Sequence, residues 1–291
     1  QYDDSFAVEG AKIGSTLRIR LPDRALVTDG AALQVQDDNE QYTTLTVSSQ
    51  KHIGVNFTSA ELTMQLDDFA ERVLKPRISQ LASSVDADVA NSYKGIYNSV
   101  GTPGTTPSTS LVLLQAQQKL NENAATMSPR YATVNPAANA GLVEGMKGLF
   151  NPTDTISRQF KNGMMGEGVL GFDEVNMSQS IKQHLTGDWG TSITVTSTVS
   201  TQGQATLPIS FTGSSKTWNV GDVFTVSGVY SVNPQTREST GSLQQFVVTA
   251  AASGSSTATL SVSPAMYTPA HALATVDSLP VAAATVTMLG S

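Results

Sequence analysis

The sequence contains no cysteine among its 291 residues. This absence excludes disulfide bonds, thiol catalysis and zinc sites with thiolate ligands. Histidine is nearly as scarce: His52 is expected in a strand, His184 near a helix end and His271 in a loop. The three are far apart in the chain, and no HExxH or comparable spacing joins them. We therefore expect neither a metal site nor a cofactor site.

Long apolar runs and an excess of basic residues are also missing. No run approaches the ~20 residues of a membrane-spanning helix, and no secretory signal opens the chain. Because the first residue is Gln1 and not Met, we expect a preceding segment to have been removed. Lys and Arg number 17 against 24 Asp and Glu, a formal net charge of −7. Such an acidic chain lacks the clustered positive charge that wrapping nucleic acid requires.

Charge almost disappears in the last third of the sequence. From Thr191 to Ser291 only five side chains are charged, and the texture becomes Thr, Ser, Val and Gly. Short alternating segments recur at 191–199, 222–227, 243–249 and 257–262, as in a β-barrel or sandwich. We expect a domain boundary near 190 and a β-rich domain after it, with Trp218 and Phe246 in its core.

The first 57 residues read as extended. Leu17, Ile19 and Leu21 alternate with polar residues, and similar alternation recurs at 45–47 and 53–57. These segments predict a long two-stranded arm with a mobile tip around 29–39. Two strands are marginal alone in water, so such an arm is expected to lie on its own chain or on another.

Residues 66–100 predict a long helix around which the rest of the chain is organised. Apolar residues recur three or four positions apart along one face, and Gly101 with Pro103 is expected to close the helix. Pro76 is expected to bend or split it. Thr58 and Glu61 form a capping box that predicts a short preceding helix.

The middle of the chain alternates between helix and strand signals. A turn-rich linker at 101–109 places Ser108 or Thr109 to cap a helix that runs to about Asn121. A short strand is expected at 130–135, and helices are expected to start at Asn135-Pro136 and at Asn151-Pro152, the second ending at Gly163.

No group of residues predicts catalysis. The pairs Asp67/Asp68 and Asp86/Asp88 have nothing else converging on them, so capping or a solvated face is the better interpretation. The glycine-rich stretch 163–168 lacks the Lys-Ser/Thr of a phosphate loop and is interpreted as a hinge before a strand. No GxSxG frames any serine.

Several segments together carry a family resemblance across nearly the whole chain. They are YDDSFAVEGAKIGSTLRIRLP, FTSAELTMQLDDFAERVLKP, YNSVGTPGTTP, RYATVNP, KGLFNPTDTISRQFKNGMMGEGVLGFDEVNMSQSIKQHLTG and GDVFTVSGVYSVNPQTRESTGSLQQFVVT. They resemble the major capsid (coat) proteins of short-tailed phages of the Salmonella-phage type, which have the Hong Kong phage capsid fold.

The resemblance implies an α+β fold with four parts. These are an N-terminal segment and extended E-loop arm at 1–57, a peripheral domain with a spine helix at 58–103, the first part of a mixed α/β axial domain at 104–190, and an all-β, barrel-like insertion domain at 191–291. In relatives an arm precedes Tyr2, and the chain continues past Ser291 to finish the axial and peripheral domains. We therefore expect this sequence to be part of a longer coat protein.

The implied function is that of a non-enzymatic virion subunit. Copies would self-assemble, in the host bacterial cytoplasm, into an icosahedral shell of hexamers and pentamers. The implied partners are a scaffolding protein, a portal and non-specifically contacted double-stranded DNA, without any membrane. Without the resemblance, a β-rich surface or adhesion protein is the favoured function. An enzyme such as a secreted glycoside hydrolase is a distant third, and it would need two carboxylates roughly 5–10 Å apart.

One set of residues is expected to join subunits. Arg18 and Arg20 share one strand face, and Arg24 follows closely, which is unusual in an acidic chain. Possible partners on an adjacent subunit are Asp67, Asp68 and Glu71 at the start of the long helix. The alternative is a solvated strand face, because exposed ion pairs contribute little.

Overall fold

The fold is that of a computed structural model, and it describes residues 16–20, 24–25, 27–28, 30–35, 42–46, 50–56, 70–145 and 166–290. The chain divides into two compact units, Gln1–Val85 and Asp86–Ser291. Both helices and strands are present, so the fold is mixed α+β. The expected capping box at 58–61, the helix at 151–163 and Asp67 with Asp68 lie outside the described residues.

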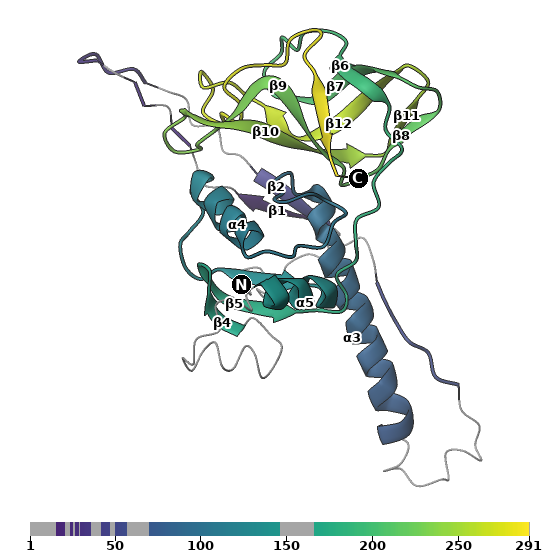
Figure 1. The fold of residues 1–291 in the computed structure, drawn as a ribbon. Coiled ribbons are helices and arrows are strands. Elements are labelled where there is room, and N and C mark those ends of the chain that lie inside the picture. The colour runs from purple at the N-terminus through teal and green to yellow at the C-terminus, as the bar shows by residue number, and fades with distance from the viewer. Residues whose placement is uncertain are drawn as a thin grey trace. The chain divides into compact units, whose positions relative to one another are not determined.

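The first unit contains two paired strands. Strand β1 (Thr16–Arg20) pairs with β2 (Tyr42–Thr46) in an antiparallel ladder that sets Arg18 opposite Thr44 and Arg20 opposite Tyr42. The strand expected at 53–57 is wrong, because residues 51–56 have no regular structure. Instead, Lys51 donates to the Ser84 carbonyl at 2.8 Å and Arg77 donates to the Gly54 carbonyl at 3.0 Å. These bonds hold the segment alongside the helix that contains Arg77 and Ser84 (Figure 1).

The long helix is present but shorter than expected at its C-terminal end. A π-helical turn η1 (Ala70–Leu74) leads into α3 (Lys75–Ala90), which ends in the 3₁₀ turn η2 (Asn91–Gly95). The change from π to α geometry falls next to Pro76, where a break was expected, because proline has no N–H to donate. Closure at Gly101 is wrong: Ile96 is already extended, at φ −100° and ψ 119°.

A small α/β layer lies in the second unit (Figure 1). Helix α4 (Leu111–Glu122) is followed by β3 (Tyr131–Val134), α5 (Pro136–Gly145), β4 (Gly166–Val169) and β5 (Phe172–Met177). The strand order is β3-β5-β4, with β3 and β5 parallel. Leu113, Leu142 and Val175 belong to its apolar core.

Local capping explains where these helices start. The Asn135 side chain accepts the Ala138 N–H at 2.7 Å, and Pro136 opens α5, as the sequence predicts. Helix α4, by contrast, begins after Ser110 without a side-chain cap, so the expected Ser108 or Thr109 cap is wrong.

The glycine-rich stretch forms a hairpin in its described part. Gly166 lies in β4, so the hinge interpretation is wrong for 166–168. Leu170 and Gly171 connect β4 to β5 with φ of 51° and 82°, the two positive values that a tight hairpin turn requires.

Residues 191–290 are rich in strands, as the sequence predicts, and belong to the second compact unit together with residues 86–190. Their strands are β6 (Thr191–Val195), β7 (Gln204–Thr212), β8 (Lys216–Trp218), β9 (Val223–Val232), β10 (Ser239–Ala250), β11 (Ala252–Gly254), β12 (Thr257–Met266) and β13 (Val286–Leu289). Six of them form one sheet in the order β13-β9-β10-β12-β7-β6. A bridge between Thr194 and Thr285, with Val195 bonded to Ala283 and Ala284, joins the two edge strands. The sheet therefore closes into a barrel.

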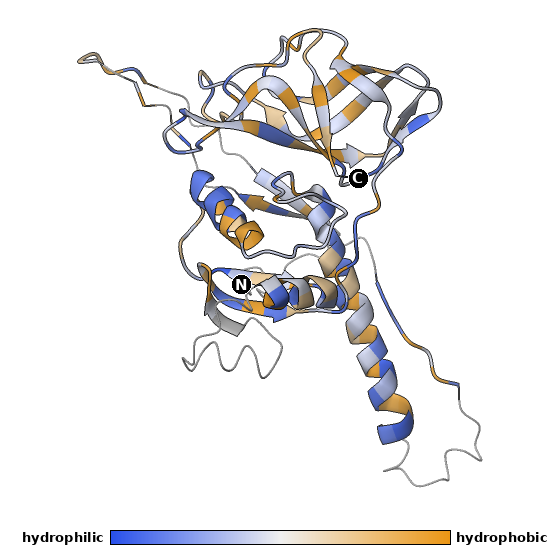
Figure 2. Cartoon of the chain, viewed as in Figure 1, coloured by the Kyte–Doolittle hydropathy of each residue, from blue (hydrophilic) through white to orange (hydrophobic). Residues whose placement is uncertain are grey.

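The barrel encloses one large apolar core. Trp218 and Phe246 are both buried there, as the sequence predicts, and apolar residues line the strands in Figure 2. Gly228, at φ +78°, marks a bulge in β9 that turns both Val226 and Val229 inward although they are three residues apart.

Two histidine expectations are wrong. His52 is exposed and lies in the irregular segment 51–56. His184 lies in an irregular stretch between β5 and β6, away from any helix end in its own segment. His271 lies in a turn, as predicted.

Candidate functional site

Strand alternation gives the β1–β2 pair one basic face. Arg18, Arg20, Tyr42 and Thr44 occupy positions of the β1–β2 ladder that share one face. The Arg18 guanidinium carbon lies 5.0 Å from the Tyr42 ring centroid, a cation–π contact. Both arginines are exposed. This face can therefore present positive charge held beside an aromatic ring.

Two other residues predicted to join subunits, Arg24 and Glu71, lie outside the β1–β2 ladder. Arg24 is exposed and lies outside regular structure. Glu71, in η1, forms an i,i+4 ion pair with Lys75 at 2.7 Å, in which both side chains are 70% exposed. A pair this exposed stabilises the helix only weakly. The structure therefore supplies Glu71 with a partner on its own helix.

Apolar side chains on α3 are unusually exposed. No residue of this helix is buried, and Ile78, Val85 and Val89 are 64%, 48% and 66% exposed. The periodic apolar face that predicts the helix is therefore open in the isolated chain, as the orange positions along α3 in Figure 2 show. On β2, Leu45 is also 57% exposed. Contiguous exposed apolar surface of this kind is typical of protein interfaces.

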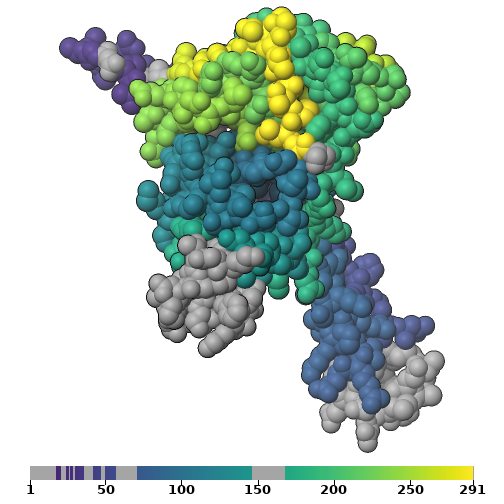
Figure 3. Space-filling model, in the orientation of Figure 1, coloured from purple at the N-terminus to yellow at the C-terminus, as the bar shows by residue number. Residues whose placement is uncertain are grey.

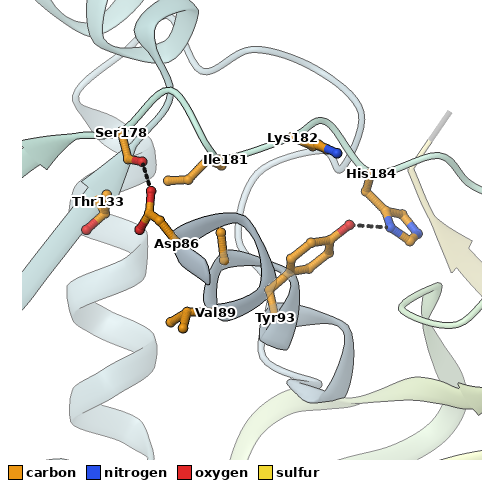
Figure 4. A pocket seen from close by; sticks show the side chains of 9 residues that line it. Asp86, Val89, Tyr93, Thr133, Ser178, Ile181, Lys182 and His184 are labelled. Atoms are coloured by element: carbon orange, nitrogen blue, oxygen red, sulfur yellow. Dashed lines mark hydrogen bonds between the residues drawn. The ribbon is translucent and has the colours of Figure 1, made fainter. Parts of the chain in front are cut away.

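A pocket of about 470 Å³ lies at the end of α3 (Figure 4). Val89 and Ile181 form part of its apolar lining. Asp86, which also lines the pocket, accepts a hydrogen bond from the Ser178 hydroxyl at 3.0 Å. Hydrogen bonds from Ser180 and then Ser178 lower the pKa of Asp86 below its ordinary value of 3.8. The carboxylate therefore anchors the start of the segment that leads to the barrel.

The same pocket is bordered by a chain of three polar side chains that the sequence reasoning missed. The Tyr93 hydroxyl lies 2.9 Å from His184 Nδ1, and His184 Nε2 lies 2.9 Å from Asp222 Oδ1. A neutral imidazole that donates from Nε2 leaves Nδ1 to accept the tyrosine proton. Figure 4 shows Tyr93 reaching from the helix end to His184.

Asp222 is fully buried and is the centre of this group. Its Oδ2 accepts hydrogen bonds from the Trp189 indole at 2.9 Å and from the backbone N–H groups of Gly187 and Asn219 at 3.1 and 2.8 Å. A buried carboxylate needs such donors to offset its desolvation. Asp222 is one of five charged residues after Thr191, and this scarcity was the available signal.

The chemistry open to this group is structural. Both ring nitrogens of His184 are engaged, so the ring has no free lone pair for a metal or a substrate proton. Across the described residues, no group of three or more His, Asp or Glu is arranged to hold a metal ion. In the same part of the chain, no helix is long and apolar enough to cross a membrane.

One family model matches the chain, and it covers nearly all of it. The model described as "P22 coat protein - gene protein 5" matches residues 13–291. No curated protein sequence matches at a significant level.

Solved structures give weaker similarities. The CUS-3 coat protein I-domain is 29% identical over 34% of this chain and 96% of its own, with a TM-score of 0.26. A structure titled "Mycobacterium phage Che8" is 14% identical over 87% of this chain and 83% of its own, with a TM-score of 0.47. A cyanophage P-SCSP1u capsid structure is 12% identical over 96% and 81%, with a TM-score of 0.39.

Proposed function

The chain belongs to the P22 coat protein family and is a major capsid structural protein of a tailed phage, and we propose that its copies close into an icosahedral shell of hexamers and pentamers around double-stranded DNA. The single observation that carries this function is the family match over residues 13–291. The match spans the charge-rich and charge-poor regions alike, which leaves the adhesion hypothesis without support. Membership makes the chain a self-assembling virion component with a structural role.

The β1–β2 pair is proposed to be the extended E-loop arm, which lies over a neighbouring subunit. Two strands are marginal by themselves in water, and in the described part of this pair Leu45, on the face opposite the arginines, is more than half exposed. A neighbouring copy would bury the apolar face and meet Arg18, Arg20 and Arg24 on the charged side. Asp67, Asp68 and Glu71 remain the proposed acidic partners.

Helix α3 is proposed to be the spine helix of the peripheral domain, within residues 58–103. Its support is the open apolar face formed by Ile78, Val85 and Val89. Burying apolar area contributes about 25 cal/mol per Å² removed from water, so a partner on this face gives assembly a driving force.

The barrel is proposed to be the insertion domain, carried on an axial domain that starts in 104–190. The support is the position of its two ends. A Cβ built on Gly290 would lie 3.4 Å from Thr186 Cγ2 and 3.3 Å from the Pro103 carbonyl oxygen. The two ends of the barrel therefore lie close together, the arrangement that an inserted domain requires. Figure 3 shows the green-to-yellow barrel surface adjoining the teal surface of the elements that precede it in the second unit.

The remaining partners follow from the proposed assembly. A scaffolding protein and a portal are proposed to act in the host cytoplasm, and DNA is proposed to be contacted non-specifically. With a net charge of −7, the subunit is expected to enclose DNA without binding it tightly.

The test is assembly itself. The full-length protein, co-expressed with its scaffolding protein, is expected to sediment as particles that electron microscopy resolves as closed shells. The same protein without scaffolding is the matched control for spontaneous aggregation. Monomers and small oligomers in both preparations would contradict the proposal.

A further inference from the structure

Residues 184–190 are held to the barrel more extensively than to the elements before them. Asp188 N–H donates to Thr217 Oγ1 at 3.2 Å, and Thr217 N–H donates back to the Asp188 carbonyl at 3.0 Å. Lys216 pairs with the Asp188 carboxylate at 2.9 Å, and the Asn219 side chain donates to the Leu185 carbonyl at 3.2 Å. These bonds fasten the segment along β8 and the turn that follows it.

Asp222 completes this attachment from inside. It accepts hydrogen bonds from His184, Gly187 and Trp189, three residues of the same segment, while being fully buried. Removing the segment would take three donors from a buried carboxylate that also accepts a hydrogen bond from the Asn219 N–H. Because a buried charge without donors is costly, 184–190 and the barrel form one body.

The residues just before this segment, 178–183, are bonded to elements that precede the barrel. Ser178 N–H donates to the Val134 carbonyl at 3.0 Å, and Ser178 Oγ donates to Asp86. The Gln183 side chain donates to the Gly104 carbonyl. Residues up to Gln183 are therefore bonded to the elements before the barrel, and residues from His184 onward are bonded to the barrel. The two sets meet in a stretch without regular structure.

Side-chain hydrogen bonds join the barrel body to the elements before it at three described places. Tyr93 bonds His184, and Gln245 on β10 makes two bonds with the Ser99 backbone, accepting from its N–H at 2.9 Å and donating to its carbonyl at 3.0 Å. The Asn233 side chain, after β9, donates to the Glu122 carbonyl at the end of α4 at 3.2 Å. None of these contacts involves a residue of the apolar barrel core, so they can break without disturbing that core.

We propose that Tyr93–His184, Ser99–Gln245 and Asn233–Glu122 form a three-point latch, and that the barrel, with residues 184–190 attached, swings as one body about 178–183 when the latch opens. His184 stays on Asp222 in the open state, and the Tyr93 hydroxyl is the group that leaves. Opening the latch lets the barrel reorient relative to the elements before residue 178 while its own core stays packed. It does not depend on shell formation.

Spin-label distances test this directly, because the cysteine-free chain accepts labels only where they are introduced. One pair, Ser92→Cys with Ser256→Cys, joins exposed positions on η2 and on the barrel. The control pair, Leu185→Cys with Ser256→Cys, lies wholly within the proposed body, and Leu185 is 80% exposed. Opening the latch with Tyr93→Phe, Gln245→Ala and Asn233→Asp, the last of which keeps the side-chain oxygen that caps its own turn, is expected to broaden the first distance distribution and leave the control pair narrow.

Two outcomes of that measurement overturn the proposal. Equal broadening of both pairs means that 184–190 does not travel with the barrel. No broadening of either pair means that these contacts do not hold the barrel in place.

Amide hydrogen exchange on the full chain gives an independent readout. Tyr93→Phe alone is expected to speed exchange of the Ser99 amide roughly 2- to 10-fold, the effect of losing one hydrogen bond. The Gly187 and Asn219 amides, which donate to Asp222, are expected to stay within about 2-fold. Tyr131→Phe, at an exposed tyrosine of β3, is the control. Faster exchange at Gly187 matching that at Ser99, or none at Ser99, contradicts the latch.

Discussion

The Trp189 indole donates a hydrogen bond to the fully buried carboxylate of Asp222 at 2.9 Å, across 33 positions of sequence. The contact ties the segment entering the barrel to the turn before β9. It places a charged residue at the base of a domain that otherwise has few charges. The attachment of residues 184–190 to the barrel is therefore polar, although the barrel core beside it is apolar.

Asp222→Ala is expected to destabilise the chain by roughly 3–5 kcal/mol, because the substitution leaves buried donors without an acceptor. Asp188→Ala is the matched control: that carboxylate is 73% exposed in its ion pair with Lys216, so the expected loss is below about 1 kcal/mol. Denaturant unfolding measures both. Similar losses of unfolding free energy in the two variants would show that Asp222 contributes no more than an exposed carboxylate to holding residues 184–190 on the barrel.

A fragment comparison tests the boundary of the barrel body. Residues 184–290 are expected to give a dispersed amide spectrum and cooperative unfolding. Residues 191–290, the boundary that charge alone predicts, lack three donors to Asp222 and are expected to be less stable. If the shorter fragment proved equally stable, residues 184–190 would be a linker and no part of the body.

The sequence predicts the barrel well because its signal is local. Alternation in β9, β10 and β12 reflects strands with one buried face, and Trp218 and Phe246 are buried as large aromatics should be. Strand β7 escaped notice because Pro208 interrupts its pattern, yet it pairs with β12 on one side and β6 on the other.

What could not be predicted depends on contacts between distant segments. Residues 53–57 alternate like a strand, but Lys51 and Arg77 hold the adjoining backbone along α3. The helix ends at Gly95 because the chain must then run extended, so that Ser99 meets Gln245. The Tyr93–His184–Asp222 group joins residues up to 129 positions apart, and no spacing motif marks it.

Tyr93 is expected to titrate above its ordinary pKa of 10.0, because burial and then the negative charge of Asp222 both disfavour the phenolate. The stability linked to its neutral form is therefore fully present below pH 10 and is lost as pH rises through the raised pKa. Ultraviolet difference titration of wild type against Tyr93→Phe isolates this group. Asp222→Asn is expected to lower the Tyr93 pKa, and an unchanged pKa in that variant would refute the electrostatic coupling.

Arg18→Glu with Arg20→Glu is expected to leave the subunit folded but to block or misdirect assembly. Both side chains are exposed on the arm, so the unfolding free energy should change by less than about 1 kcal/mol. Arg18→Lys with Arg20→Lys preserves the charge and serves as the control. Circular dichroism reports the fold and sedimentation reports the particles. Normal shells from the glutamate variant would identify this face as solvated surface.

The most direct test of the account is an electron cryomicroscopy reconstruction of particles formed by the full-length protein with its scaffolding partner. The account predicts a closed icosahedral lattice in which the β1–β2 arm lies on a neighbouring subunit and the apolar face of α3, with Ile78, Val85 and Val89, is covered. Particles without a closed lattice, or a lattice that leaves both the arm and this helix face open to solvent, would contradict it.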